Sequence, residues 1–189
     1  MKKDRMGLFL IIFLITISLF LIILPTFSSK HSGRVEMHRE INLPLLDAQK
    51  EKLLFVFFGY TGCVDICTPR LTQVGHWYRS LKDPLQEESK FLFFDLSRPA
   101  EISMPDEFAK AFNPEFEGIY LDDETLNDYS RAFDVYYAPS LSREYEYDHT
   151  PHLYMLKKGK HGYNLRYIYF AYPYDLQQIE TDIKELLRE

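Results

Sequence analysis

The chain has two cysteines, Cys63 and Cys67, which are separated by only three residues. The apolar run Leu53–Phe58 precedes them, and Thr68 and Pro69 follow at once. This order predicts a buried strand, a loop with two thiols, and a helix with Thr68 as N-cap and Pro69 as its first residue. A helix N-terminus stabilises the thiolate, the form of cysteine that attacks disulfides and binds soft metals.

Two kinds of chemistry are open to thiols with this spacing. The sulfurs can form a reversible disulfide, or they can converge on one soft metal ion. Cu(I) accepts two thiolates readily, whereas Cu(II) needs an additional nitrogen ligand, which imidazole supplies. A purely structural disulfide is the weaker interpretation, because closing a loop with three intervening residues removes little chain entropy.

The remaining elements predict how this loop is positioned. Strands and helices alternate along the chain, and such alternation implies right-handed crossovers and a parallel core sheet. A late hairpin adds antiparallel strands. We therefore predict an α/β class protein with a thioredoxin-like fold, a central mixed sheet flanked by helices. The expected strands are 53–58, 91–96, 116–121, 152–156 and 167–171, and the expected helices are 69–81, 106–112, 122–133 and 175–187.

The N-terminal segment predicts attachment to the cell (inner) membrane. A basic start precedes the apolar run Gly7–Leu24, which is long enough to be a transmembrane helix. The basic flank would stay in the cytoplasm, so the rest would be exported to the periplasmic or extracytoplasmic side. A cleaved signal peptide is the alternative, although its apolar core is normally only about 7–15 residues. The expected parts are an anchor (1–26), a linker (27–45) and a folded domain (46–189).

The charge of the chain excludes one class of partner. The formal net charge is −6, and residues 1–30 contain four Lys or Arg and one Asp, so the remainder carries −9. An acidic domain lacks the basic footprint of a nucleic-acid-binding protein. In an oxidising exported compartment, the two thiols would form a disulfide unless a reductant or a metal keeps them apart.

A third ligand would have to come from one of six histidines. His149 and His152 flank Thr150 and Pro151, just before a predicted strand. In a thioredoxin-like fold the loop before this strand lies opposite the cysteines, so His149 would face the thiols. His152 would point elsewhere by strand alternation. On the residues alone, His149 is either a solvated side chain or a ligand. We interpret the others as surface or structural residues: His31, His38, His76 and His161.

Three separated motifs resemble those of the Sco/SenC family. Phe-Gly-Tyr-Thr-Gly-Cys-Val-Asp-Ile-Cys-Thr-Pro is similar to the family segment in which Phe-Gly-Tyr-Thr leads into Cys-x-x-x-Cys, and Asp65 matches its acid. Asp148–Thr150 resembles the Asp-His-Ser/Thr motif, whose histidine is the third copper ligand of the family. Phe94-Asp95 and residues 130–139 resemble two further family segments. The similarity extends over most of residues 53–170.

The resemblance implies a copper site with Cys63, Cys67 and His149 as metal ligands. It also implies a membrane-anchored metallochaperone that delivers copper to the binuclear copper site of a cytochrome c oxidase subunit, or maintains the thiols of that site. The alternative is a metal-free thiol-disulfide oxidoreductase that acts on another exported thiol protein. Cys63, which we expect to be the more exposed thiol, would then attack, and Cys67 would resolve the mixed disulfide. A third interpretation is an interaction domain with an inert disulfide.

Overall fold

The computed structural model of the chain describes residues 12–20, 33–97, 102–141, 143 and 146–189. The chain divides into two units, Met1–Ser32 and Gly33–Glu189.

In the first unit, residues 12–20 are helical. The other residues of the predicted membrane span Gly7–Leu24 lie outside the described residues. Within the described part of the chain, no helix has both the length and the apolar character needed to cross a bilayer.

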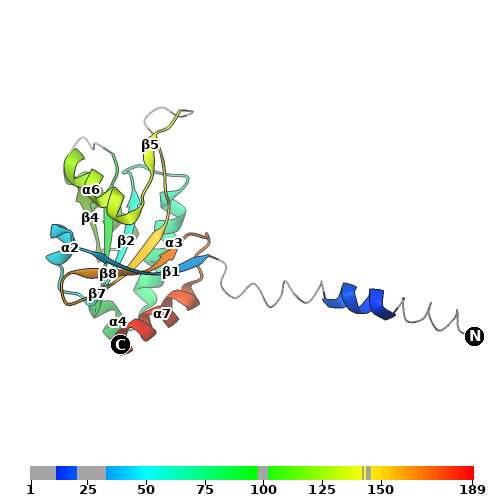
Figure 1. Cartoon of the computed structure of the whole chain (residues 1–189). Coiled ribbons are helices and arrows are strands. Elements are labelled where there is room, and N and C mark those ends of the chain that lie inside the picture. The colour runs from blue at the N-terminus through cyan, green and yellow to red at the C-terminus, as the bar shows by residue number, and fades with distance from the viewer. Residues whose placement is uncertain (1–11, 21–32, 98–101, 142, 144–145) are drawn as a thin grey trace, which may run out of the picture. The chain divides into compact units, whose positions relative to one another are not determined.

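The second unit is built around a mixed sheet. Its strands are β1 (Arg34–Ile41), β2 (Leu53–Gly59), β3 (Ser89–Asp95), β4 (Phe116–Tyr120), β5 (Tyr137–Pro139), β6 (Tyr147–His149), β7 (Leu153–Lys158) and β8 (Tyr163–Tyr169). Six of them form one sheet in the order β1-β8-β7-β2-β3-β4 (Figure 1). β2, β3 and β4 are parallel, and β7, β8 and β1 add antiparallel pairs. β5 and β6 form a separate antiparallel pair.

Helices cover both faces of this sheet. They are α2 (Pro44–Asp47), α3 (Cys67–Ser80), α4 (Asp83–Glu87), α5 (Met104–Phe112), α6 (Asp123–Phe133) and α7 (Leu176–Arg188). Apolar side chains of α3, α5 and α7 pack on one face, and those of α2 and α6 pack on the other. The sequence prediction of a mixed sheet flanked by helices is therefore confirmed.

The alternation of side chains along β2 explains why this strand is central. Leu53, Phe55 and Phe57 enter the core on the α3 side, whereas Leu54, Val56 and Phe58 enter the core on the α6 side. Every residue of β2 is buried. Successive residues of a strand point to opposite faces, so a strand that is apolar throughout needs a cover on both sides. The thiol loop leaves the end of this rigid strand.

The linker prediction for residues 27–45 is wrong for part of its length. Residues Arg34–Ile41 form β1, which pairs antiparallel with β8 at the edge of the sheet. Its side chains are mostly polar, because an edge strand with one partner needs apolar side chains only where it meets the core. Arg34 also reaches the fully buried Asp182 of α7, with 3.1 Å between Nη1 and Oδ1.

The pair β5–β6 is a further element that the sequence did not predict. Tyr137 pairs with His149, and Pro139 pairs with Tyr147. Each strand has only three residues, which is too short for a periodic pattern to appear. This small sheet carries His149, so it decides where the predicted third ligand lies.

Candidate metal centre

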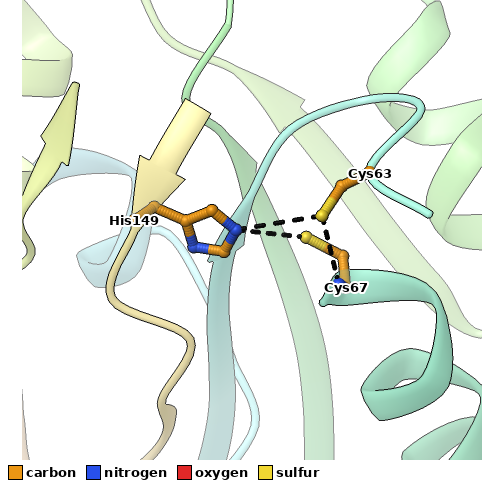
Figure 2. A group of neighbouring side chains, drawn as sticks. All are labelled: Cys63, Cys67 and His149. Atoms are coloured by element: carbon orange, nitrogen blue, oxygen red, sulfur yellow. Dashed lines mark hydrogen bonds between the residues drawn. The ribbon is translucent and has the colours of Figure 1, made fainter. Parts of the chain in front are cut away.

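Cys63, Cys67 and His149 lie together although they are up to 86 residues apart in the sequence. Nε2 of His149 is 3.9 Å from Sγ of Cys63 and 3.4 Å from Sγ of Cys67. Figure 2 shows the imidazole directed at both sulfurs, with His149 on β6 and Cys67 at the start of α3. The three donor atoms all lie within 4.8 Å of one another. Among the described residues, these are the three His, Cys, Asp or Glu side chains whose donor atoms lie close enough together to bind one metal ion.

The first turn of α3 is arranged around the sulfur of Cys63. The helix begins at Cys67, and no side chain caps it in the usual way. Instead, the backbone N–H of Cys67 donates a hydrogen bond to Sγ of Cys63 at 3.1 Å. A helix N-terminus has free N–H groups and a partial positive charge, and both favour an anionic sulfur here. The sulfur of Cys63 therefore accepts the kind of hydrogen bond that an N-cap side chain usually accepts.

Thr68 does not serve as the N-cap, so that prediction is wrong. Its hydroxyl donates to the carbonyl oxygen of Cys63 at 2.8 Å, and its backbone N–H donates to the same oxygen at 3.1 Å. Since α3 begins two residues earlier than expected, Cys67 lies in the helix and Thr68 in its first turn. The two bonds fix the backbone of Cys63 against the helix.

The buried carboxylate of Asp95 holds the loop that carries Cys63. Asp95 is the last residue of β3 and is fully buried. The hydroxyl of Thr61 donates to its Oδ2, and so does the backbone N–H of Thr61 at 3.1 Å. Its Oδ1 accepts from the backbone N–H of Ser97 at 2.7 Å. Asp95 thus joins the loops that follow β2 and β3.

We expect Asp95→Ala to destabilise the domain by about 2 kcal/mol or more, because several donors would lose their acceptor in a buried place. The loop around Thr61 would also lose its fixed position, so affinity for a metal at Cys63 would fall. Chemical denaturation and metal titration measure the two effects. Asp122→Ala is the matched control, since that carboxylate caps the exposed end of α6. An unchanged stability of Asp95→Ala would contradict this role.

Aromatic rings and backbone bonds orient His149. The ring of Tyr60 lies edge-on to the imidazole, with 5.9 Å between centroids and an interplanar angle of 89°. The ring of Tyr147 lies 5.7 Å from Tyr60. The backbone N–H of Thr150 donates to the carbonyl of Tyr136 at 2.9 Å, and the Thr150 hydroxyl accepts from the Tyr136 N–H at 3.0 Å. The imidazole is therefore oriented before any metal arrives.

An ion pair connects the two loops of the site. Arg143, between β5 and β6, pairs with Asp65 from the thiol loop and with Glu146 beside β6. No local pattern predicts this pair, because Asp65 and Arg143 are 78 residues apart in the sequence. The side chains are largely exposed, so the pair contributes little to stability. Its effect is to restrain the distance between the loops.

All three donor side chains are buried, which corrects one expectation. Cys63 is 1% exposed and Cys67 is 0% exposed, so Cys63 is not an accessible attacking thiol. Hydrogen bonds from the Cys67 thiol and from His149 lower the pKa of Cys63, against the opposing effect of burial. Burial, together with the neighbouring Cys63, raises the pKa of Cys67. The two shifts have opposite directions, so Cys63 is the thiol that loses its proton more readily.

The donor set fits a soft or borderline transition metal. Two sulfurs suit Cu(I), and the added imidazole also suits Cu(II). Coordination through Nε2 of His149 requires its proton on Nδ1. Nδ1 is buried and has no hydrogen-bond partner among the described residues. The site thus supplies three donors, of which at least one cysteine must lose a proton when metal binds.

The other histidines do not join the site. His38, His76 and His161 are exposed, in agreement with the sequence interpretation, and His31 lies outside the described residues. His152 is half-buried, with its ring 6.2 Å from that of Tyr154, and it does not belong to the group of donors around the thiols. The predicted reason, strand alternation, is wrong, because His152 precedes β7 and is not part of a strand.

We expect His152 to titrate below 6.5, because burial and the charge of Arg70 lower its pKa. The unfolded chain then takes up this proton at a higher pH than the folded domain. Stability contributed by the neutral His152 is therefore lost as the pH falls below 6.5, down to the folded pKa. NMR titration of the ring measures the pKa. A value at or above 6.5 would contradict the prediction.

The chain is similar to known proteins in sequence and in fold. The SCO1/SenC family model matches residues 47–188. An SCO2-like protein from Rickettsia conorii is 27% identical over 128 residues, which are 65% of this chain and 61% of that protein. The solution structure of apo Sco1 from Thermus thermophilus matches with a TM-score of 0.65 and 26% identity, over 84% of this chain and 99% of that one.

A second solved structure shares the fold. The structure of Arabidopsis thaliana ScoI with copper bound matches with a TM-score of 0.59 and 20% identity, over 73% of this chain and 86% of that one. These matches confirm the predicted family resemblance and the thioredoxin-like arrangement of the domain. The chain spans 61% of the length of the Rickettsia relative.

Proposed function

This chain belongs to the SCO1/SenC family, and from that premise we propose that it is a copper-binding protein with Cys63, Cys67 and His149 as ligands. It carries copper to the binuclear copper site of a cytochrome c oxidase subunit, or maintains the thiols of that site. Copper is its cargo and not a catalyst in a reaction of its own.

One observation supports this function above the others. Nε2 of His149 points at both sulfurs, and a dithiol that only exchanges disulfides does not need an imidazole in that place. The donors are buried, so a bound ion would be shielded from water and from adventitious thiols. The β5–β6 pair, Tyr60 and the Arg143–Asp65 ion pair all position this third donor.

We further propose that the apolar segment Gly7–Leu24 anchors the protein in the cell membrane, with the copper site on the exported side. The basic residues before this segment favour that orientation. In this place the domain would meet oxidase subunits that are assembled in the same membrane. Fractionation of cells that express the full chain with a C-terminal tag, followed by protease treatment of intact cells, tests both points.

Complementation with the full chain tests the proposed function. In cells that lack their own Sco-type protein, the wild-type chain is expected to restore the copper content and activity of cytochrome c oxidase. The Cys63→Ser and His149→Ala variants are expected to fail at equal expression. The His76→Ala variant alters an exposed histidine outside the site and serves as the control. Restoration of the oxidase by the Cys63→Ser variant would overturn the proposal.

The second candidate function is a metal-free thiol-disulfide oxidoreductase. It is favoured by the bond from the Cys67 N–H to Sγ of Cys63 and by the lowered pKa of Cys63, since both stabilise a reactive thiolate. The burial of both sulfurs and the convergence of His149 argue for copper instead. If the domain turned over as a disulfide reductase and had no measurable copper affinity, the oxidoreductase function would replace the copper function.

A further inference from the structure

The folded domain begins at Gly33, which lies against the segment that follows β8. The carbonyl oxygen of Gly33 accepts hydrogen bonds from the backbone N–H groups of Phe170 at 2.9 Å and Ala171 at 3.4 Å. Gly33 has φ +122°, and a Cβ atom there would lie 2.6 Å from Cβ of Ala171. Glycine alone tolerates both the conformation and the close approach. The point where the chain enters the domain is therefore fixed beside Phe170.

Arg34, the next residue, also keeps this entry point in place. Its Nη1 is 3.1 Å from Oδ1 of the fully buried Asp182, and its guanidinium lies over the ring of Tyr167, 4.1 Å from the centroid. The hydroxyl of Tyr169 donates to Oδ2 of the same carboxylate at 2.6 Å. Because a buried charge that loses its partner is costly, this ion pair holds the start of β1 against α7.

Three exposed apolar side chains gather around the entry point. Val35 is 48% exposed, Phe170 is 43% exposed and Tyr172 is 44% exposed. Val35 lies two residues after Gly33 and Tyr172 lies two residues after Phe170, so both flank the bonded pair Gly33–Phe170. We call Val35, Phe170 and Tyr172 the entry patch. Exposed apolar side chains that gather in one place are typical of a surface that meets a protein or a membrane.

Contacts with α3 hold the Tyr172 side of the entry patch in position. The guanidinium of Arg70 stacks on the ring of Tyr172, 4.7 Å from its centroid. Gln73 exchanges two hydrogen bonds of 3.0 Å with the backbone of Tyr174, which ties this segment to the helix. The ring of Tyr174 meets that of Tyr172 edge-on, with 6.1 Å between centroids. The exposed rings therefore belong to a fixed surface.

The segments that carry the entry patch contain no acidic residue, although the domain as a whole is acidic. Residues 6–35 include Lys30 and Arg34 but no Asp or Glu, and residues 149–174 also lack Asp and Glu. The first acid after Tyr172 is Asp175, whose carboxylate accepts the Gln178 N–H at the start of α7. The negative charge is thus carried by other segments, so it does not prevent these side chains from meeting a phospholipid surface.

The strand register places the entry patch and the metal centre at the same end of the sheet. Arg34 of β1 pairs with Tyr169 of β8, which pairs with Leu153 of β7, which in turn pairs with Phe57 of β2. Neighbouring strands are about 4.8 Å apart, so β1 and β2 are about 15 Å apart along this row. The thiol loop leaves β2 just after Phe57, and His149 lies four residues before Leu153.

The length of chain before Gly33 identifies the surface that the entry patch meets. Residues 25–32 alone separate the apolar segment Gly7–Leu24 from Gly33. A fully extended chain covers at most about 3.6 Å per residue, so Gly33 lies no more than about 32 Å from the end of that segment. If Gly7–Leu24 spans a bilayer, the surface of this bilayer is always within reach of the entry patch.

We propose that Val35, Phe170 and Tyr172 insert into the interfacial region of the bilayer in which Gly7–Leu24 is anchored, and so turn the metal centre towards the membrane surface. Aromatic rings favour this region, because the ring is apolar and the tyrosine hydroxyl stays in contact with water. The occupant is a phospholipid surface, since the chain that reaches the patch comes from it. The proposal rests on the proposed membrane anchor and is independent of copper.

Quenching of tryptophan fluorescence by brominated lipid tests this contact. The full metal-free chain is reconstituted in phosphatidylcholine vesicles whose acyl chains carry bromine near the headgroup. The single native tryptophan, Trp77, is buried and gives the baseline. With Tyr172→Trp, the bromine is expected to remove at least about half of the added fluorescence, because the indole would lie in the interfacial region.

His161→Trp is the matched control. His161 is an exposed ring in the turn between β7 and β8, at the other end of the sheet from Tyr169. A strand rises about 3.3 Å per residue, so β8 carries this position about 20 Å away from the entry patch. Its added fluorescence is expected to show no quenching above the baseline. Equal quenching of the Tyr172→Trp and His161→Trp variants would overturn the membrane contact.

A second set of variants separates insertion from mere closeness to the membrane. Val35→Trp reports on the same patch and is expected to be quenched as strongly as Tyr172→Trp. Adding Phe170→Ser and Tyr172→Ser to Val35→Trp should reduce the quenching at least about threefold, because the aromatic side chains that hold the patch in the bilayer are gone. Unchanged quenching would mean that the short tether alone brings the patch close, and would overturn the proposal. Thermal melts of the variants show that they are folded.

An alkaline carbonate wash of the same vesicles separates this proposal from the anchor. A chain that stays with the lipid while Tyr172→Trp shows only baseline quenching keeps the anchor and overturns the membrane contact of the entry patch. A chain that the wash removes overturns both. Because the protein is free of metal throughout, a failure of the copper function leaves the quenching result unchanged, and copper titration of the same preparation tests that function separately.

Discussion

Replacing Cys63 or Cys67 by serine is expected to lower the affinity of the domain for Cu(I) by at least about a hundredfold. Even the loss of a group that only orients a metal ligand costs about 10–100-fold, and each serine removes one of two soft donors. The competition of each variant with a chromophoric Cu(I) chelator, under anaerobic conditions, measures the affinity. Since the two sulfurs are both buried and both face His149, the two serine variants should be similarly impaired.

His149→Ala should discriminate between the two oxidation states of copper. Two thiolates suffice for Cu(I), so its affinity is expected to fall by only about tenfold. Cu(II) prefers nitrogen ligands, so its binding, followed by the sulfur-to-copper absorption band, is expected to be lost. His152→Ala is the matched control, because this histidine lies three residues further along and is outside the group of donors. Unchanged binding of Cu(II) by His149→Ala would remove His149 from the ligand set.

Gly59→Ala is expected to damage the site without replacing any ligand. A Cβ atom at Gly59 would lie 2.7 Å from Sγ of Cys67 and 2.9 Å from the ring of Phe93. Both neighbours are buried, so one of them must move, at a cost of about 1–3 kcal/mol for overpacking. If the sulfur moves, its distance to Nε2 of His149 changes and copper affinity falls. Denaturation and copper titration of the same preparation give both quantities.

Gly62→Ala is the control for that prediction. It makes the same chemical change in the same loop, but no atom lies within 4 Å of the added Cβ. The backbone there has φ +88°, so the variant costs stability through strain and not through contact with a sulfur. We expect Gly62→Ala to lose stability and to keep its copper affinity better than Gly59→Ala. Equal copper affinities for wild type and Gly59→Ala would show that the Cys67 sulfur tolerates the added methyl group.

Much of the fold was predictable because its strands and helices have strong local patterns. β2 is apolar throughout and ends in a glycine before a polar turn, so its burial and its end could be read directly. The last helix, α7, shows helical spacing of apolar residues. It begins directly after Asp175, whose side chain accepts a hydrogen bond from the Gln178 N–H. β1 was missed because a polar edge strand has the composition of a linker. β5 and β6 were missed because strands of three residues have no measurable period.

The sequence by itself determined the two thiols of the site. Their type, their spacing and their place between a buried strand and a helix are local properties, and local chemistry is sufficient to predict a reactive or metal-binding dithiol. The motif resemblance added His149 as a candidate but could not give its distance to the sulfurs.

Only the tertiary structure decided how the third donor is held and how the site is enclosed. The imidazole reaches the sulfurs because β5 and β6 pair, because Tyr60 lies edge-on to it, and because Arg143 of this pair meets Asp65 of the thiol loop. Each contact joins segments far apart in the sequence, and side-chain patterns within one segment carry no information about the other. For the same reason the burial of Cys63 became visible only in the folded chain.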